Sequence, residues 1–295
     1  MDYISDNRLK SQKWKFYFVL VAWPVYLFIL PYLYLKIGLL SVVFMIFPGI
    51  YLFTWCGFLM HESWHKYVPG LSYGFFYNVF AWMLFTDPQV YRMVHGGHHS
   101  NVNSWNDTEF HPIGKIENFV LRRIYNIFEI ILGIAFITVI TLFVVPFHPQ
   151  YKAKYSFIKL FTSVVVWSAF LGSIGYLSYI TFSVSVKQII ISFSLSLWIN
   201  SIVLHHSQLV EHGNLIVDGD WKQRNIKTRN LKNSGIFEKI FIFLTHGDSS
   251  EHVLHHTLVG IYSRPFPGVV PMPQESVYIT LRDYLGILRG MVTEK

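Results

Sequence analysis

Two long apolar runs near the amino terminus constrain the fold of this chain more than any other feature. The first covers about residues 16–35 and the second about 39–60, and only Lys36, Ile37 and Gly38 separate them. Each run has the roughly 20 residues that an α-helix needs to cross a hydrocarbon core about 30 Å thick. The short gap between the runs predicts a helical hairpin that returns the chain to the side from which it entered.

The composition of the whole chain also indicates a membrane protein. Of the 295 residues, 52% are hydrophobic and only 14% are charged, which departs from a soluble average. The net charge of +7 would suit a nucleic-acid-binding domain, but the basic residues lie mainly beside the apolar runs, where they orient membrane helices. We therefore expect a single domain, residues 1–295, with no nucleic-acid partner. Its fold class is all-α: an integral membrane helical bundle with four or more transmembrane helices.

The basic residues predict the orientation of this bundle. Arg8, Lys10, Lys13 and Lys15 precede the first run, and basic residues favour the cytoplasmic side. No small-residue cleavage signature follows them, so we expect the first run to remain as an anchor. The chain becomes polar and basic again after residue 210. These features predict that both termini and a histidine-rich cap lie in the cytoplasm.

Histidines provide the main evidence for function. Eight of the fourteen histidines lie in three windows of five residues each. These histidine boxes contain His61 and His65; His95, His98 and His99; and His252, His255 and His256. Residues three or four positions apart share one face of a helix, so each box can direct its imidazoles at one point.

The number of histidines favours two metal ions rather than one. Imidazole nitrogens bind iron, zinc, copper and nickel, and eight or nine of them are more than one ion uses. A single HxxxH pair on a helix could equally be a surface pair. Three boxes near membrane depth favour a shared metal site, because unpaired polar groups are costly there.

The later apolar runs raise a problem of topology. Residues 71–85 are too short for a span and are interrupted by Asn78, so we expect an interfacial or re-entrant helix there. Candidate spans follow at about 127–147, 157–180 and 189–204. If the boxes share one site, the chain must cross the membrane an even number of times between the second and third boxes. Therefore one of the three runs does not span the membrane, or the last two runs are divided into spans differently than hydropathy suggests.

The pattern HxxxH, HxxHH, HxxHH resembles the membrane fatty acid desaturase and hydroxylase superfamily. The resemblance covers about residues 61–267, and the order and spacing of the three boxes are more specific than any single box. Bacterial members are the most similar, because they have three further motifs that correspond here to Asp107 and Glu109, to Glu211-His212-Gly213, and to Thr228-Arg229-Asn230. The segment Tyr262-Ser-Arg-Pro-Phe-Pro267 replaces the usual Leu-Phe-Pro, a departure that bears on the substrate rather than on the metal.

The resemblance implies a centre of two iron ions that uses O₂ as co-substrate to remove hydrogen from an unactivated C–H bond, with no catalytic residues beyond the metal centre. It also suggests His212 as a ninth ligand, the alternative being an ordinary interfacial histidine. Second-sphere carboxylates that orient metal-bound imidazoles are expected among Glu62, Asp107, Glu109 and Glu251. The alternative for each is an exposed acid. His205 and His206 are expected to cap backbone carbonyls or meet lipid headgroups.

The electrons must come from another protein. Cys56 is the one cysteine, so this chain cannot hold a four-cysteine iron–sulfur cluster, and no nucleotide-binding glycine motif is present. We expect a separate ferredoxin, cytochrome or reductase as the electron donor.

The leading hypothesis is an acyl-chain desaturase that acts on a lipid or acyl-chain substrate. A lipid hydroxylase is the first alternative, because both reactions begin with the same hydrogen abstraction and part only on substrate placement. A metal transporter is a remote alternative, since it would place the histidines inside the apolar runs rather than at their ends. The sequence does not rank the possible lipid substrates.

Overall fold

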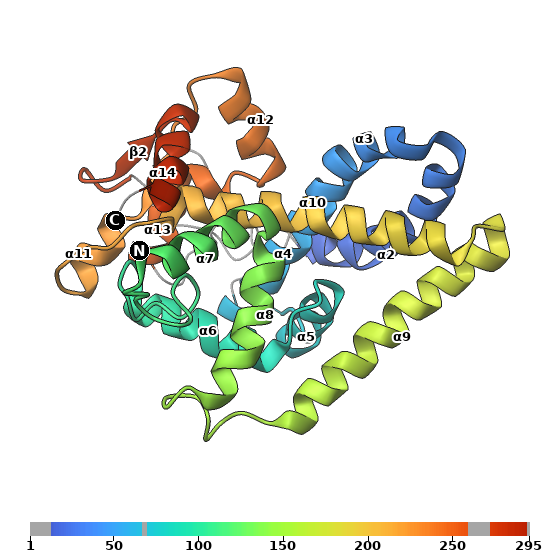
Figure 1. Cartoon of the computed structure of the whole chain (residues 1–295), viewed down its shortest axis with the longest axis horizontal. Coiled ribbons are helices and arrows are strands. Elements are labelled where there is room, and N and C mark those ends of the chain that lie inside the picture. Colours follow the sequence, from blue (N-terminus) through green and yellow to red (C-terminus); the bar gives the residue numbers. More distant parts are fainter. Residues whose placement is uncertain (1–12, 67–69, 259–271, 294–295) are drawn as a thin grey trace.

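The computed structural model describes residues 13–66, 70–258 and 272–293. Within these residues the protein is mostly helical (Figure 1). The elements up to the middle of the chain are α2 (Lys13–Ile37), η1 (Gly38–Ser41), α3 (Val42–Phe44), η2 (Met45–Gly49), α4 (Ile50–His65), α5 (Tyr73–Met83), α6 (Pro88–Asn101), α7 (Phe119–Leu132), α8 (Ile134–Val144) and η3 (Val145–Phe147). The remaining elements are α9 (Phe157–Phe182), α10 (Val186–His212), α11 (Trp221–Ile226), β1 (Arg229–Leu231), α12 (Ile236–Leu244), α13 (Asp248–Thr257), β2 (Val277–Ile279) and α14 (Leu281–Thr293).

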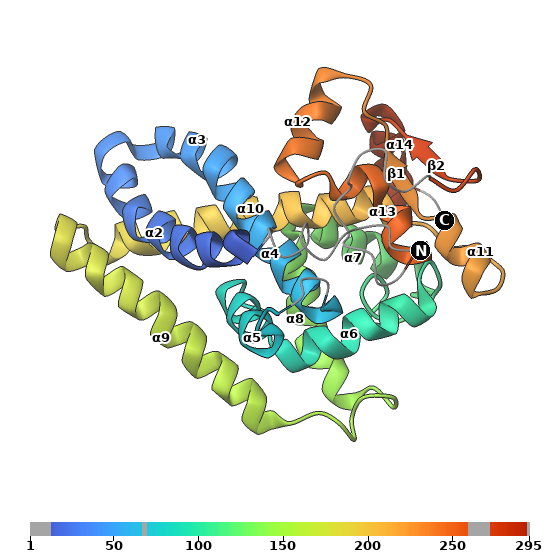
Figure 2. The same ribbon diagram turned by 180° about the vertical axis from the view of Figure 1, so that it is seen from behind.

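Two antiparallel helical hairpins form the apolar part of the molecule. The first joins α2 to α3 and α4 and turns at Gly38, whose φ of +56° favours glycine. The second joins α9 to α10 and turns at residues 183–185. Stretches long and apolar enough to cross a membrane are Lys13–His65, which contains the whole first hairpin, Phe157–Phe182 and Val186–His212. In Figures 1 and 2 both hairpin turns lie at one end of the molecule, whereas α6, α11, α13 and α14 lie toward the other.

The expected span over 127–147 is wrong. The chain breaks there at Gly133, which separates α7 from α8 with φ +62° and ψ −143°. The apolar stretch after the break, Ile134–Phe147, is shorter than a membrane span. Between the second and third histidine boxes, the long apolar helices in the described residues are therefore α9 and α10. This even number is what a site shared by the three boxes requires.

Polar contacts between helices hold the two hairpins together. Tyr26 of α2 and Ser196 of α10 share a hydrogen bond of 2.8 Å, and the Ser178 hydroxyl of α9 donates to the carbonyl of Phe28 on α2 at 2.8 Å. Around these bonds the core is aromatic and aliphatic, and Cys56 is buried in it as a packing residue. The expected short helix over 71–85 is α5, which packs against α4.

The outer face of α9 remains uncovered. Phe157, Ile158 and Phe161 are 67%, 80% and 69% exposed, and they lie in an apolar helix long enough to span a membrane. A contiguous exposed apolar surface of this kind marks contact with lipid or another apolar partner.

A short parallel sheet departs from the expected all-α fold. β1 pairs with β2 in the register Arg229↔Val277, Asn230↔Tyr278 and Leu231↔Ile279. Strands of three residues are too short to leave a periodic pattern in the sequence. Arg8, Lys10 and the segment Tyr262–Pro267, on which part of the sequence argument rested, lie outside the described residues.

The break at Gly133 predicts a strict requirement for glycine. A Cβ atom at this position would lie 2.4 Å from the carbonyl oxygen of Ser201, and the backbone conformation is one that glycine alone adopts readily. Gly133→Ala should therefore lower the free energy of unfolding by roughly 2 kcal/mol or more.

The matched control is Gly172→Ala in α9, where a Cβ would meet no atom within 4 Å. It should leave stability unchanged or raise it slightly. Thermal unfolding of both variants in detergent tests the difference, and equal melting temperatures would contradict the close contact between Gly133 and α10.

Candidate metal centre

Four helices bring the histidine boxes together. The first box lies in the last turns of α4, which ends where Lys66 takes a left-handed conformation with φ +61°. The second lies on α6, whose first turn is fixed by Pro88 and by the Asp87 carboxylate, which accepts a hydrogen bond from the Val90 N–H at 2.9 Å. The third lies on α13, and His212 ends α10.

The histidines form two clusters, which we call the first and the second cluster. The first consists of His61, His65, His95, His99 and His255, whose ligand atoms all lie within 4.8 Å of one another. Their Nε2 atoms face each other at 3.0 Å (His95–His99), 3.1 Å (His61–His255 and His99–His255), 3.2 Å (His65–His99) and 3.3 Å (His65–His95). Thus all three boxes contribute to the first cluster.

The second cluster consists of His98, His212, His252 and His256. The Nε2 atoms of His212 and His252 are 3.1 Å apart, as are those of His252 and His256, and those of His212 and His256 are 3.3 Å apart. The His98 ring lies 4.8 Å from the His212 ring between centroids. The Glu211 carboxylate adds an oxygen 3.4 Å from the His252 Nε2.

The donor set of both clusters fits metal ions. Two nitrogens bound about 2.1 Å from one ion at right angles to each other would lie about 3.0 Å apart, close to the separations in both clusters. Hydrogen bonds alone do not account for five converging Nε2 atoms, because one proton can satisfy only one pair of them. The residues therefore suit two ions, one in each cluster.

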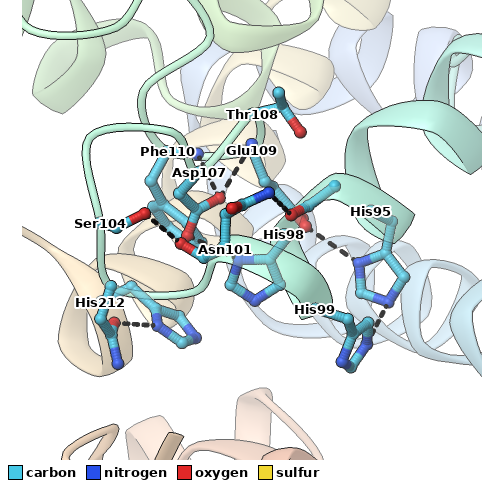
Figure 3. A network of polar contacts seen from close by, with 12 residues as sticks. His95, His98, His99, Asn101, Ser104, Asp107, Thr108, Glu109, Phe110 and His212 are labelled. Carbon is cyan, nitrogen blue, oxygen red and sulfur yellow. Dashed lines mark hydrogen bonds and ion pairs between the residues drawn. The ribbon is translucent and has the colours of Figure 1, made fainter. Parts of the chain in front are cut away.

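Carboxylates hold the second box in the orientation that a metal site requires. The His95 Nδ1–H donates to Glu109 at 2.9 Å and the His98 Nδ1–H donates to Asp107 at 2.8 Å (Figure 3). The second oxygen of Asp107 accepts from the backbone N–H of Glu109 at 3.0 Å, which fixes both acids on the loop after α6. With the proton on Nδ1, each imidazole presents the lone pair of Nε2 to its cluster.

Two further residues contact Nδ1 atoms of the second cluster and were missed by the sequence analysis: Asn103 as a hydrogen-bond acceptor and Asp248 through an ion-pair contact. The Asn103 side-chain oxygen lies 2.9 Å from His212 Nδ1, and the Asp248 carboxylate lies 3.3 Å from His252 Nδ1. Asp248 is four residues before His252 on α13, so helical spacing could have predicted it. Asn103 carries no such signal, because it meets His212 across 109 residues of sequence.

Among the described residues, neither Glu62 nor Glu251 is seen to hydrogen-bond a histidine ring, so the orienting role expected of them stays a prediction. Glu62 is fully buried, but its carboxylate is 3.8 Å from His61 Nδ1, beyond hydrogen-bond distance. Glu251 lies at a kink in α13 and is half-buried. Within the described part of the chain, the Nδ1 atoms of His255 and His256 have no hydrogen-bond partner.

Burial and mutual repulsion lower the pKa of several histidines outside the spans. Burial, reinforced by neighbouring histidines, holds the pKa of His95, His255 and His256 well below the usual value. Burial also disfavours charge on His252, but the Glu211 and Asp248 carboxylates outweigh it and raise the pKa of His252 to about 9. A metal ion entering the second cluster would therefore release a proton from His252.

A chain of buried polar groups extends from the first cluster to α7. Glu109 accepts a hydrogen bond from the Gln208 amide at 3.3 Å, and the Gln208 oxygen accepts from His205 Nδ1 at 3.2 Å. The other nitrogen of His205 pairs with the buried Glu129 carboxylate at 3.1 Å. His206 contacts the carbonyl of Ile130, as expected for a capping histidine, whereas the ion pair of His205 was not expected.

The Thr228-Arg229-Asn230 motif braces the site from outside. The Thr228 hydroxyl accepts a hydrogen bond from Asn103, which in turn contacts His212. Arg229 donates to the carbonyl of Gly213 at the end of α10. Asn230 accepts from the backbone N–H of Val253, next to His252, at 3.1 Å. Each motif residue thus stabilises a segment that carries a cluster histidine.

Both clusters border one cavity of about 110 Å³. Histidines at its polar wall are His61, His95, His98, His212, His252 and His255. The rest of the lining is largely apolar and includes Gly57, Leu84, Ile134, Ile137 and Leu204. The break at Gly133 matters here, because it places the first residues of α8 in this part of the lining.

Comparison with known proteins identifies the family. A sequence model of the family described as Fatty acid desaturase matches residues 37–264. The chain belongs to the fatty acid desaturase family. This confirms the resemblance inferred from the three boxes, and the matched region contains all nine cluster histidines. A comparison with curated proteins and one with solved structures each gave no match. Membership of the desaturase family makes this chain an oxidoreductase-type membrane protein with a lipid substrate.

The carboxylate behind His95 offers a direct test of the centre. In Glu109→Ala the His95 Nδ1–H loses its acceptor, so the protein should bind iron about 10- to 100-fold more weakly. Iron retained per chain after titration with a chelator measures this.

Glu117→Ala is the control, because Glu117 is exposed and forms an ion pair with the surface residue Lys115 at 3.0 Å. Its iron retention should equal that of the wild type. Equal retention in Glu109→Ala and Glu117→Ala would refute the orienting role of Glu109.

Proposed function

We propose that this protein is an O₂-dependent acyl-chain desaturase with one iron ion in each histidine cluster. The observation that supports this most is the position of the two clusters, because six of their nine imidazoles line a single, largely apolar cavity. All nine histidines named from the sequence belong to this proposed ligand set. Desaturation converts R–CH₂–CH₂–R′, O₂, two electrons and two protons into R–CH=CH–R′ and two molecules of water.

The metal supplies what amino-acid side chains cannot. Two iron ions, once reduced, would activate O₂ strongly enough to cleave unactivated C–H bonds, which acid–base groups do not cleave. The tasks of the protein itself are to hold the imidazoles in one tautomer, to exclude water and to position the acyl chain. Asp107, Glu109 and Asn103 perform the first task through their contacts with Nδ1 atoms.

The cavity beside the clusters would exclude water and position the acyl chain. Gly57 of α4, Leu204 of α10 and Ile134 of α8 come from three different helices and line its apolar part. An extended acyl chain held among them would present its methylene groups to the histidine wall. The exclusion of water from such an apolar channel protects the oxidation from side reactions.

Four membrane crossings account for the arrangement of the clusters. The two hairpins would each enter from the histidine side and return to it, so that His61, His65 and His212 lie at the ends of returning helices. Near the hairpin turns the basic residues are Lys36 and Lys187, whereas the histidine side carries many more. The distribution of positive charge supports a cytoplasmic histidine cap.

An external electron donor would reach the first cluster through α11. The Trp221 side chain is 44% exposed and its Nε1–H donates to the carbonyl of His99 at 2.9 Å. Lys222 and Lys227 are exposed beside it and would attract an acidic redox protein. A ferredoxin, a cytochrome or a reductase would meet this requirement.

Loss of one second-cluster ligand should abolish the reaction. His98→Ala should retain less iron per chain than the wild type and form no product, because the second cluster would be left with three imidazoles. His148→Ala is the control, since His148 lies outside both clusters and its Nδ1 contacts the backbone N–H of Gln150. Iron quantification and lipid mass spectrometry test both variants.

The mass of the product distinguishes the two leading activities. A loss of two daltons relative to the acyl substrate supports desaturation. A gain of one oxygen atom would show that the protein is a hydroxylase and not the proposed desaturase. Full activity and unchanged iron content in His98→Ala would refute the shared centre itself.

Gly57 should control the chain length that the cavity accepts. A Cβ there would lie 3.4 Å from Leu204, an ordinary contact, so Gly57→Ala should be tolerated. Gly57→Leu should fill the apolar part of the cavity and shift products toward shorter chains, roughly 10-fold or more for each methylene excluded. Lipid mass spectrometry measures the shift, with unchanged iron content as the control. An unaltered product distribution in Gly57→Leu would show that the acyl chain lies elsewhere.

A further inference from the structure

A second and larger cavity lies behind α6. Its volume is about 670 Å³, and it is bounded by α5, α6, the segment 150–154 and the first turns of α9. We call it the basic cavity, because Arg92, Lys154 and Lys159 line it.

The two faces of α6 separate the basic cavity from the site of oxidation. Val90, Tyr91, Val94, His95 and His98 line the cavity beside the histidine clusters. The intervening residues Gln89, Arg92, Met93, Gly96 and Gly97 line the basic cavity. This alternation follows from the 3.6-residue period of the helix. A ligand in the basic cavity would thus contact the back of the second histidine box and stay out of the proposed acyl channel.

Among the described residues, the three cations of the basic cavity outnumber its single acid, Asp87, and form no ion pair with it. In the described part of the chain, no carboxylate lies within 4.0 Å of Arg92, Lys154 or Lys159 in an ion pair. The guanidinium group of Arg92 lies instead over the Tyr77 ring, 5.2 Å from its centroid. The single acid in the lining, Asp87, has both oxygens engaged by the Val90 N–H and the Ser163 hydroxyl.

Polar groups surround these cations. Asn78 and Gln150 belong to the lining, and each has a side-chain amide that can donate hydrogen bonds, whereas the Thr162 hydroxyl already donates to the carbonyl of Ile158. Together with three cations from three segments, the two amides make a concave site for an anion with several acceptor oxygens.

The position of the basic cavity indicates where such an anion would come from. Lys159 and Thr162 lie in the first two turns of α9, next to Phe157, Ile158 and Phe161, which are exposed along an apolar helix. A phosphate at this level would belong to a lipid whose acyl chains lie against α9. Basic cavities between helices at the cytoplasmic face bind anionic headgroups in this way.

We propose that the basic cavity binds the phosphate headgroup of an anionic membrane phospholipid that is not the substrate. The headgroup would bridge Arg92 of α6, Lys154 of the segment 150–154 and Lys159 of α9. It would thereby fix the start of the second hairpin against the helix that carries the second histidine box.

Retention of phospholipid by the purified full-length protein tests this proposal. The wild type is equilibrated in neutral detergent with phosphatidylglycerol or phosphatidylcholine, and the bound lipid is counted by native mass spectrometry. We expect preferential retention of phosphatidylglycerol. The double variant Lys154→Ala/Lys159→Ala should weaken it about five-fold for each lysine removed, hence about 25-fold in total.

A matched double variant controls for the general loss of positive charge. Lys152→Ala/Lys187→Ala removes two exposed lysines that do not line the basic cavity, and its lipid retention should equal that of the wild type. The iron content of each variant is measured alongside, to establish that the histidine clusters remain folded.

Several results would overturn the proposal. Equal retention of the two lipids by the wild type would exclude an anion-selective site, whatever the variants do. Equal losses in the two double variants would indicate nonspecific attraction. Displacement of phosphatidylglycerol by inorganic phosphate at the same concentration would assign the cavity to a soluble anion instead of a membrane lipid.

Discussion

The convergence of nine imidazoles at one end of two helical hairpins is the constraint on which the rest of the structure depends. Neutral histidines buried this closely repel added protons, and their Nε2 atoms need a shared partner. The surrounding residues orient the imidazole rings through the other ring nitrogen, Nδ1. Asp107, Glu109 and Asn103 on the loop after α6 accept the Nδ1–H groups of His98, His95 and His212. The Thr228-Arg229-Asn230 motif contacts Asn103 and the backbone of α13.

Much of this centre could be predicted because many of the residues that form it lie close together in the sequence. Histidines three and four residues apart on a helix must share a face, so each box was visible in the sequence, and the acids at Asp107 and Glu109 follow their box closely. Asn103 could not be predicted, since its partner His212 is remote in sequence. Glu62 and Glu251 adjoin histidines along the chain, but adjacent residues on a helix point in different directions, and neither is seen to hydrogen-bond an Nδ1 atom among the described residues.

The membrane helices were predicted less completely for a related reason. Hydropathy averages over a window, so it joined α7 and α8 across Gly133 into one apparent span. The break depends on a backbone conformation and on a close approach to Ser201 of α10, and neither contributes to a hydropathy average. The strands β1 and β2 could not be predicted, because three residues are too few to show a periodic pattern. In contrast, both hairpins followed from long apolar runs with short gaps.

The break at Gly133 means that α8 helps to line the cavity without also having to cross a bilayer. A helix that crosses a bilayer must keep a lipid-facing surface along its whole length, which limits how its inner surface can change. α8 is shorter than a span, yet Ile134 and Ile137 belong to the lining of the cavity beside the histidines. The shape of this cavity and the length needed to cross a bilayer therefore depend on different segments. Substitutions in α8 can reshape the cavity while the long apolar helices and their histidines stay as they are.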